Sequence, residues 1–112
     1  MYGSGGNMTL GKLIARLERE NPEKIIENGF GEADSYRGFY QDTAFAPAKN
    51  TTVAKMLVFA KAALGNTYTG YKGGEFRMDK DTDVWIAEYG NLGEALTPRA
   101  LECILTHGSK AW

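Results

Sequence analysis

Three stretches of this chain carry apolar residues at helical spacing, and the sequence between them is rich in glycine, threonine and aromatic residues. Apolar side chains at positions i, i+3, i+4 and i+7 lie on one face of a helix, and that face needs a partner surface. The first predicted helix spans residues 10–20, with Thr9 as a suitable N-cap. Asn21-Pro22 ends it, because a residue before proline avoids the helical conformation. Its apolar stripe consists of Leu10, Leu13, Ile14 and Leu17.

A second helix is predicted over Val53–Leu64. Asn50, Thr51 or Thr52 is suited to cap its beginning, and Gly65 is suited to end it in the left-handed conformation. The face expected to be buried consists of Val53, Met56, Leu57, Ala60, Ala63 and Leu64.

A third helix is predicted to begin at Thr97-Pro98, with threonine as the N-cap and proline in the first helical position. Gly108 is expected to cap its end. Its inner stripe consists of Leu101, Ile104 and Leu105.

Short strands are predicted between the helices. They are expected at Lys24–Ile26, at Thr43–Ala46, on both sides of a glycine-bearing turn within 67–78, and at Thr82–Tyr89. Asn28-Gly29 is expected to end the first of these strands and Pro47 the second. Between them, residues 30–40 are expected to form an aromatic loop. This order of elements predicts an α+β fold, with about three helices on one face of a small antiparallel sheet.

The length of 112 residues fits one small domain with one core. We assign this domain to residues 8–112. Residues 1–7, MYGSGGN, are interpreted as a flexible leader, either a cloning remnant or an upstream start. The alternative is an arm that docks on a neighbouring subunit through Tyr2.

The composition excludes several classes of protein. A net charge of -1 argues against a general nucleic-acid binder, which is usually strongly basic. One cysteine excludes an intrachain disulfide and a CxxC zinc site, and one histidine makes a histidine-based metal centre within one chain unfavourable. There is no run of about 20 apolar residues that would cross a membrane. A free thiol without disulfides fits a cytoplasmic protein, which is what we expect.

The aromatic residues mark where a ligand is expected to bind. Nine of the thirteen lie in 30–40 and 68–89, mostly beside glycines and polar residues. Tyrosine and tryptophan stack on planar rings, and glycines allow close approach to the backbone. Arg37 offers a fork of donors to a phosphate, and Lys72 adds a point charge. The expected ligand-binding residues are Ser35, Tyr36, Arg37, Tyr40, Thr69, Tyr71, Lys72, Gly73, Gly74 and Trp85, with Gly73 and Gly74 offering backbone N–H groups to an anion.

A purely structural interpretation of the same residues stays open. Tyr68, Phe76 and Trp85 have the side chains that sheets favour, and for Trp85 alone a place in the core is preferred to a place in the site. Arg37 can pair with Asp34 or Asp42 on the surface. Cys103 is interpreted as a structural thiol, and His107 as a residue that favours the end of a helix dipole.

Known catalytic and metal-binding motifs are missing. TGYKGG lacks the spacing of a phosphate-binding P-loop. Asp79, Asp81 and Asp83 alternate as in a calcium loop, but the required glycine and glutamate are absent from the later positions. A magnesium site at Glu75, Asp79 and Asp81 would support an enzyme acting on nucleotides, which is the least favoured hypothesis. We therefore expect no enzyme activity, no catalytic residue, no metal and no cofactor.

Four segments of the chain resemble a family of small bacteriophage and prophage proteins. They are Ser35–Tyr40, Asp42–Phe45, Thr69–Phe76 and Thr82–Trp85, and the opening Met8–Ile14 is similar as well. The resemblance implies a phage context inside a host bacterial cell. It implies no catalytic residue, and short phage proteins of this kind often act against host defence.

Two functions follow as hypotheses. The first is a non-enzymatic protein that sequesters a small, phosphate-bearing, nucleotide-like immune signal. Its site is expected between subunits of a homo-oligomer, because a domain of this size forms only a shallow pocket alone. The second is a protein–protein inhibitor of a host defence enzyme, such as an anti-CRISPR protein, with the tyrosines as interface anchors.

Overall fold

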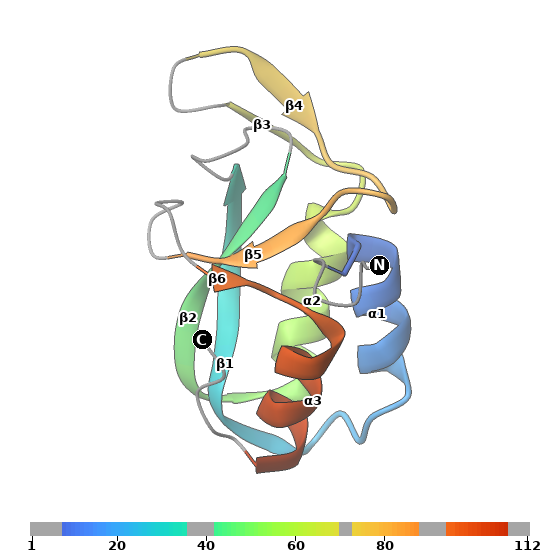
Figure 1. The fold of residues 1–112 in the computed structure, drawn as a ribbon, viewed down its shortest axis with the longest axis vertical. Coiled ribbons are helices and arrows are strands. Elements are labelled where there is room, and N and C mark those ends of the chain that lie inside the picture. Colours follow the sequence, from blue (N-terminus) through green and yellow to red (C-terminus); the bar gives the residue numbers. More distant parts are fainter. Residues whose placement is uncertain (1–7, 36–41, 70–72, 88–93, 108–112) are drawn as a thin grey trace.

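The computed structural model describes residues 8–35, 42–69, 73–87 and 94–107, which form an α+β fold (Figure 1). The expected leader, residues 1–7, lies outside the described residues. Within the described ranges, no helix is long and apolar enough to cross a membrane.

A four-stranded sheet forms one layer of the fold. Its strands are β1 (Ile25–Ser35), β2 (Thr43–Thr52), β5 (Val84–Ile86) and β6 (Glu94–Ala95), in the order β1-β2-β5-β6. β1 pairs with β2 and β5 with β6 in antiparallel orientation, but β2 and β5 are parallel. The sheet is therefore mixed, and the expectation of an antiparallel sheet is wrong for this pair. The chain between β2 and β5 contains a helix and a hairpin, which supply the long crossover that a parallel pair requires.

The first two strands are longer than the sequence predicts. β1 continues through Asn28-Gly29 into the segment expected to be a loop, and β2 continues through Pro47. Pro47 is exposed and lies opposite the buried Phe30. β5 pairs with β2 at Thr43–Phe45, so among the described strands position 47 has a neighbour only in β1. A proline is tolerated there because no second described ladder needs its missing N–H.

The three helices agree closely with the sequence prediction. They are α1 (Leu10–Glu18), α2 (Val53–Ala63) and α3 (Pro98–His107). The side chains of Thr9, Thr52 and Thr97 each accept a hydrogen bond from a backbone N–H in the first turn. Every apolar residue expected on the inner faces of α1 and α3 is buried. On α2 the expectation is wrong for Leu64, which is 42% exposed because it follows the last helical turn.

The core lies between the helices and one face of the sheet (Figure 1). Phe30 from β1 and Phe45 from β2 are fully buried, with ring centroids 4.5 Å apart. The two helices α2 and α3 both contact β1, and α1 packs against α2. This arrangement covers the apolar stripes that the three helices present.

A two-stranded hairpin lies at one end of the molecule, at the top of Figure 1. It consists of β3 (Thr67–Thr69) and β4 (Glu75–Arg77), as the glycine-bearing segment predicts. β3 is also in contact with β1. The strand expected at Thr82–Tyr89 is observed as the shorter β5, with residues 88 and 89 outside the described residues.

Candidate functional site

The ten expected ligand-binding residues divide evenly between described and undescribed positions. Tyr36, Arg37, Tyr40, Tyr71 and Lys72 lie outside the described residues. Ser35 is the last residue of β1 and Thr69 the last residue of β3. Gly73, Gly74 and Trp85 are also described.

A pocket of about 440 Å³ lies next in the chain to both predicted segments, but none of the five described members of the expected site lines it. Asp42, the residue before β2, forms one part of its wall and stands two residues after Tyr40, the end of the first segment. Glu75, Phe76 and Arg77 of β4 form another part, directly after the second segment. The tertiary structure thus brings together the flanks of two segments that are more than 30 residues apart in the sequence. The complete lining is Asp42, Glu75, Phe76, Arg77, Asp79, Asp81 and Thr82.

The turn at Asp79–Thr82 holds the third part of the pocket wall in place. The Asp79 carboxylate accepts hydrogen bonds from the backbone N–H of Asp81 at 2.9 Å and from the Thr82 hydroxyl at 3.3 Å. The Thr82 hydroxyl in turn accepts from the Asp79 N–H at 2.9 Å. The Gly11 N–H donates to the Lys80 carbonyl at 2.9 Å, which attaches the turn to the first turn of α1. This part of the wall is therefore held by the side chains of Asp79 and Thr82 within the turn, and by one backbone hydrogen bond to α1.

Asp42 connects this pocket to Trp85 on β5. The Trp85 indole N–H donates to the Asp42 carboxylate at 3.0 Å, across 43 residues of sequence. Trp85 is half-buried and packs against Ala44 and Ala87, in a small cluster separate from the main core. Trp85 thus serves both as a packing residue and as the orienting partner of a pocket carboxylate.

The carboxyl group of Asp42 is held in an unfavourable electrostatic environment. Burial raises its pKa above the ordinary value of 3.8, the negative charge of Asp83 raises it further, and the Trp85 hydrogen bond opposes this shift. Burial also raises the pKa of Asp83. Within the described part of the chain, no cation forms an ion pair with either group. Shifted carboxyl groups without a compensating charge are typical of functional sites.

We expect Asp42→Asn to stabilise the protein at neutral pH. A raised folded-state pKa means that the folded protein binds more protons than the unfolded chain, so this group lowers stability above its folded pKa. This loss of stability disappears as the pH falls toward about 4, where the carboxyl group is protonated in the folded protein. Asparagine can still accept the indole hydrogen bond, yet it carries no charge. Urea unfolding should show a higher free energy of unfolding for Asp42→Asn than for the unsubstituted protein at neutral pH. The difference should shrink at mildly acidic pH. A gain that is independent of pH, or one also seen in the exposed control Glu23→Gln, would contradict this account.

The glycines of the second segment have the conformations that only glycine adopts easily. Gly73 has φ = 93° and Gly74 has φ = 84°, and nothing lies within 4 Å of a Cβ built on Gly73. The backbone of Gly73 is therefore open to a ligand on that side. Their role in holding an anion stays a prediction.

The described lining is acidic, and three of its four carboxylates, Glu75, Asp79 and Asp81, are those considered for a magnesium site in the sequence analysis. Four carboxylates face one guanidinium, that of Arg77. The sequence analysis considered Asp42 only as one of two possible surface partners of Arg37, and it did not select Phe76 or Arg77 as site residues. No local pattern could have revealed them, because the pocket is assembled from three separate turns and strand ends. Carboxylates accept hydrogen bonds, so this wall suits ligand groups that donate them, such as hydroxyl and amino groups.

The described acidic residues of the pocket wall are not clustered as metal ligands. Among the described residues, no three His, Cys, Asp or Glu side chains are arranged to hold a metal ion. The magnesium site considered for Glu75, Asp79 and Asp81 is therefore not formed, because the Asp79 carboxylate is used within its own turn. Cys103 is a half-buried free thiol on α3, outside the pocket lining.

No protein-family model matches this chain, and no curated protein or solved structure is significantly similar to it.

Proposed function

We propose that this protein binds and sequesters a small nucleotide-like ligand at the pocket between Asp42 and the β3–β4 hairpin. The observation that supports the proposal is that the pocket is walled by the flanks of both aromatic and glycine-bearing segments. Its volume of about 440 Å³ lies in the range of small-molecule sites. The described members of the expected site do not line this pocket, and the other five lie outside the described residues, so the proposal combines the pocket with the sequence.

The charges divide the proposed site into two parts. The carboxylates of Asp42 and Glu75 suit the hydroxyl groups of a ribose and the amino groups of a base. The phosphate requires cations, which are supplied by Arg37 and Lys72. In the chain, Arg37 stands five residues before Asp42, and Lys72 stands three residues before Glu75. Both cations are thus joined to the pocket wall by short stretches of chain.

The cost of holding Asp42 charged also supports a binding role. A carboxyl group with a raised pKa destabilises the folded protein, and such groups persist where function needs them. A ligand donor would satisfy the carboxylate that the protein leaves without a cation in its described part. Because the described residues form no cluster of metal ligands and the sequence carries no known catalytic motif, we favour sequestration over turnover. In a phage protein, this activity would remove an immune signal inside the host cytoplasm.

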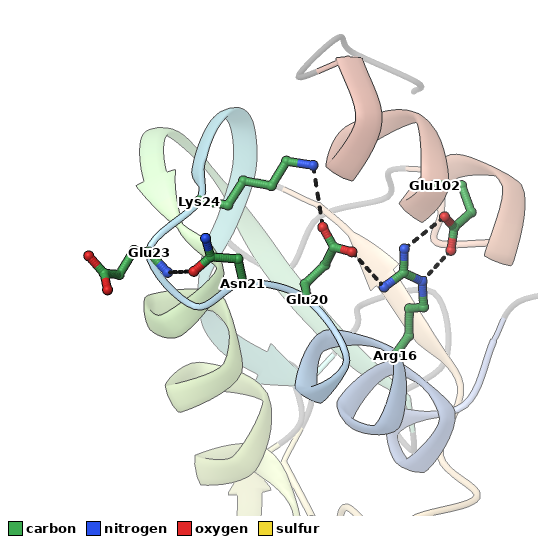
Figure 2. Close-up of polar contacts among 6 residues, drawn as sticks. All are labelled: Arg16, Glu20, Asn21, Glu23, Lys24 and Glu102. Atoms are coloured by element: carbon green, nitrogen blue, oxygen red, sulfur yellow. Dashed lines mark hydrogen bonds and ion pairs between the residues drawn. The ribbon is translucent and has the colours of Figure 1, made fainter.

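Calorimetry against a panel of linear and cyclic nucleotides and ADP-ribose derivatives tests the proposal. We expect one class to bind and to be recovered intact. Asp42→Asn, Glu75→Gln, Arg37→Ala and Lys72→Ala should each weaken binding about tenfold or more, since a hydrogen bond to a charged group contributes about 1.5–3 kcal/mol. Glu23→Gln is the matched control, because Glu23 is exposed and is drawn with its carboxylate pointing away from the other labelled residues (Figure 2).

Three results would overturn the proposal: no binding to any member of the panel, unchanged affinity in all four variants, or conversion of the ligand. A stoichiometric host protein in pull-downs, with no small molecule released on denaturation, would favour the protein–protein inhibitor instead. Light scattering with and without ligand tests whether the site needs a homo-oligomer, as the small size of the chain suggests.

A further inference from the structure

The groove between α1 and α3 has a chemistry opposite to that of the acidic pocket. It has a volume of about 360 Å³ and shares no lining residue with that pocket. Met8 and Leu101 are almost fully buried and form its bottom, while the exposed Ala15 and Pro98 form its sides. Its polar lining consists of Lys12, Arg16, Arg19 and Glu102.

Arg16 is the fixed element of this groove. Its guanidinium donates to both carboxylate oxygens of Glu102 on α3, with the Nη2–Oε1 distance 2.9 Å, and to Glu20 at 3.2 Å. Figure 2 shows Arg16 reaching from α1 to Glu102, with Lys24 extending the network through Glu20. The Arg16 hydrogen bonds lower the pKa of the Glu102 carboxyl. Arg16 is thus a clamp between the two helices, and Glu102 is already neutralised by it.

The other two cations are not held in ion pairs within the described structure, although the charge of Arg19 also helps to lower the pKa of Glu102. Lys12 and Arg19 are exposed, and neither forms an ion pair with any described residue. They stand on the same helix as Arg16, at positions i-4 and i+3 from it, so all three cations border one side of the groove. With Glu102 paired to Arg16, the groove keeps an excess of positive charge beside an apolar bottom.

We infer that the α1–α3 groove is a second binding site, for a small amphipathic anion with an apolar or aromatic body and one sulfonate, phosphate or carboxylate group. The apolar body would lie over Met8 and Leu101, and the anionic group would lie between Lys12 and Arg19. A mostly apolar concavity with a few convergent charges is the usual form of a small-molecule site. This inference does not depend on the nucleotide site, whose described wall is acidic.

The fluorescent probe anilinonaphthalene sulfonate has this chemistry, and N-phenylnaphthylamine offers a similar apolar body without the charge. We expect saturable binding of the sulfonate to the full chain, with the largest amide shifts in nuclear magnetic resonance spectra at Ala15 and Leu101. The neutral probe should bind at least about fivefold more weakly. Lys12→Gln and Arg19→Gln should each weaken sulfonate binding about threefold, and salt should weaken it further.

Two variants complete the test. Ala15→Trp fills the groove from an exposed helix position and should abolish binding without unfolding the protein, which near-ultraviolet circular dichroism verifies. Lys55→Gln is the matched control, since Lys55 is an exposed lysine on α2 outside the groove and its loss should change nothing. The inference is wrong if the sulfonate does not bind, if the shifts map elsewhere, or if both probes bind equally. It is also wrong if the sulfonate binds only after deletion of residues 1–7. That result would mean that residues 1–7 fill the α1–α3 groove in the full chain.

Discussion

Phe45→Ala is expected to lower the free energy of unfolding by about 3–5 kcal/mol, the usual cost of removing a buried phenylalanine. Phe45 is fully buried and its ring lies 4.5 Å from that of Phe30, at an interplanar angle of 39°. The two rings join β1 to β2 where the register shifts between Phe30 and Ala33. Alanine would leave a cavity at this irregular point, where the regular ladder contributes least.

Urea unfolding followed by circular dichroism measures this effect. A domain of this size has a total stability of about 5–15 kcal/mol, so the variant is expected to be marginal or partly unfolded. Val58→Ala is the control, because Val58 is 64% exposed on α2 and should change stability by less than about 0.5 kcal/mol. A loss below about 1 kcal/mol for Phe45→Ala would show that this ring pair is not part of a close-packed core.

Gly29→Ala is expected to destabilise the protein by about 1–3 kcal/mol, the usual cost of inserting a methyl group into a filled space. A Cβ at Gly29 would lie 2.6 Å from Cγ2 of Thr51 and 3.0 Å from the sulfur of Met56. Both neighbours are buried, and Thr51 belongs to the strand paired with β1. The contact is therefore relieved only by moving β1 away from β2 and α2.

Gly31→Ala is a closely matched control in the same strand. A Cβ at Gly31 would lie 3.6 Å from the nearest atom, Cβ of Ala48, which is an ordinary contact distance. Neither glycine has a positive φ, so backbone strain does not distinguish the two substitutions. Adding Thr51→Ser to Gly29→Ala removes the closest atom and should restore part of the lost stability. Equal effects of the two alanine substitutions, or no rescue by serine, would contradict the steric explanation.

The helices could be derived from sequence because their signals are local. Thr9, Thr52 and Thr97 each cap a helix within three residues of the N–H that they accept, and the apolar stripes repeat at a fixed spacing. Pro98 and Gly65 mark boundaries through their own backbone preferences. These features need no knowledge of the rest of the chain.

Strand lengths were less predictable because they depend on neighbours. Asn28-Gly29 has a turn signature, yet it lies inside β1 because Gly29 fits against Thr51 and Met56. Pro47 lies inside β2 because β5 does not extend beside it. In both cases a tertiary contact overrides a local preference.

The sequence by itself determined the α+β class and the positions of the three helices, whereas ligand binding by the two glycine-bearing segments stays a prediction. Only the tertiary structure decided that β2 and β5 are parallel, that Trp85 orients Asp42, and that the flanks of both segments wall one acidic pocket. The physical reason is range: caps and stripes act over a few residues, whereas the Asp42–Trp85 hydrogen bond spans 43 residues and exists only after the chain has folded.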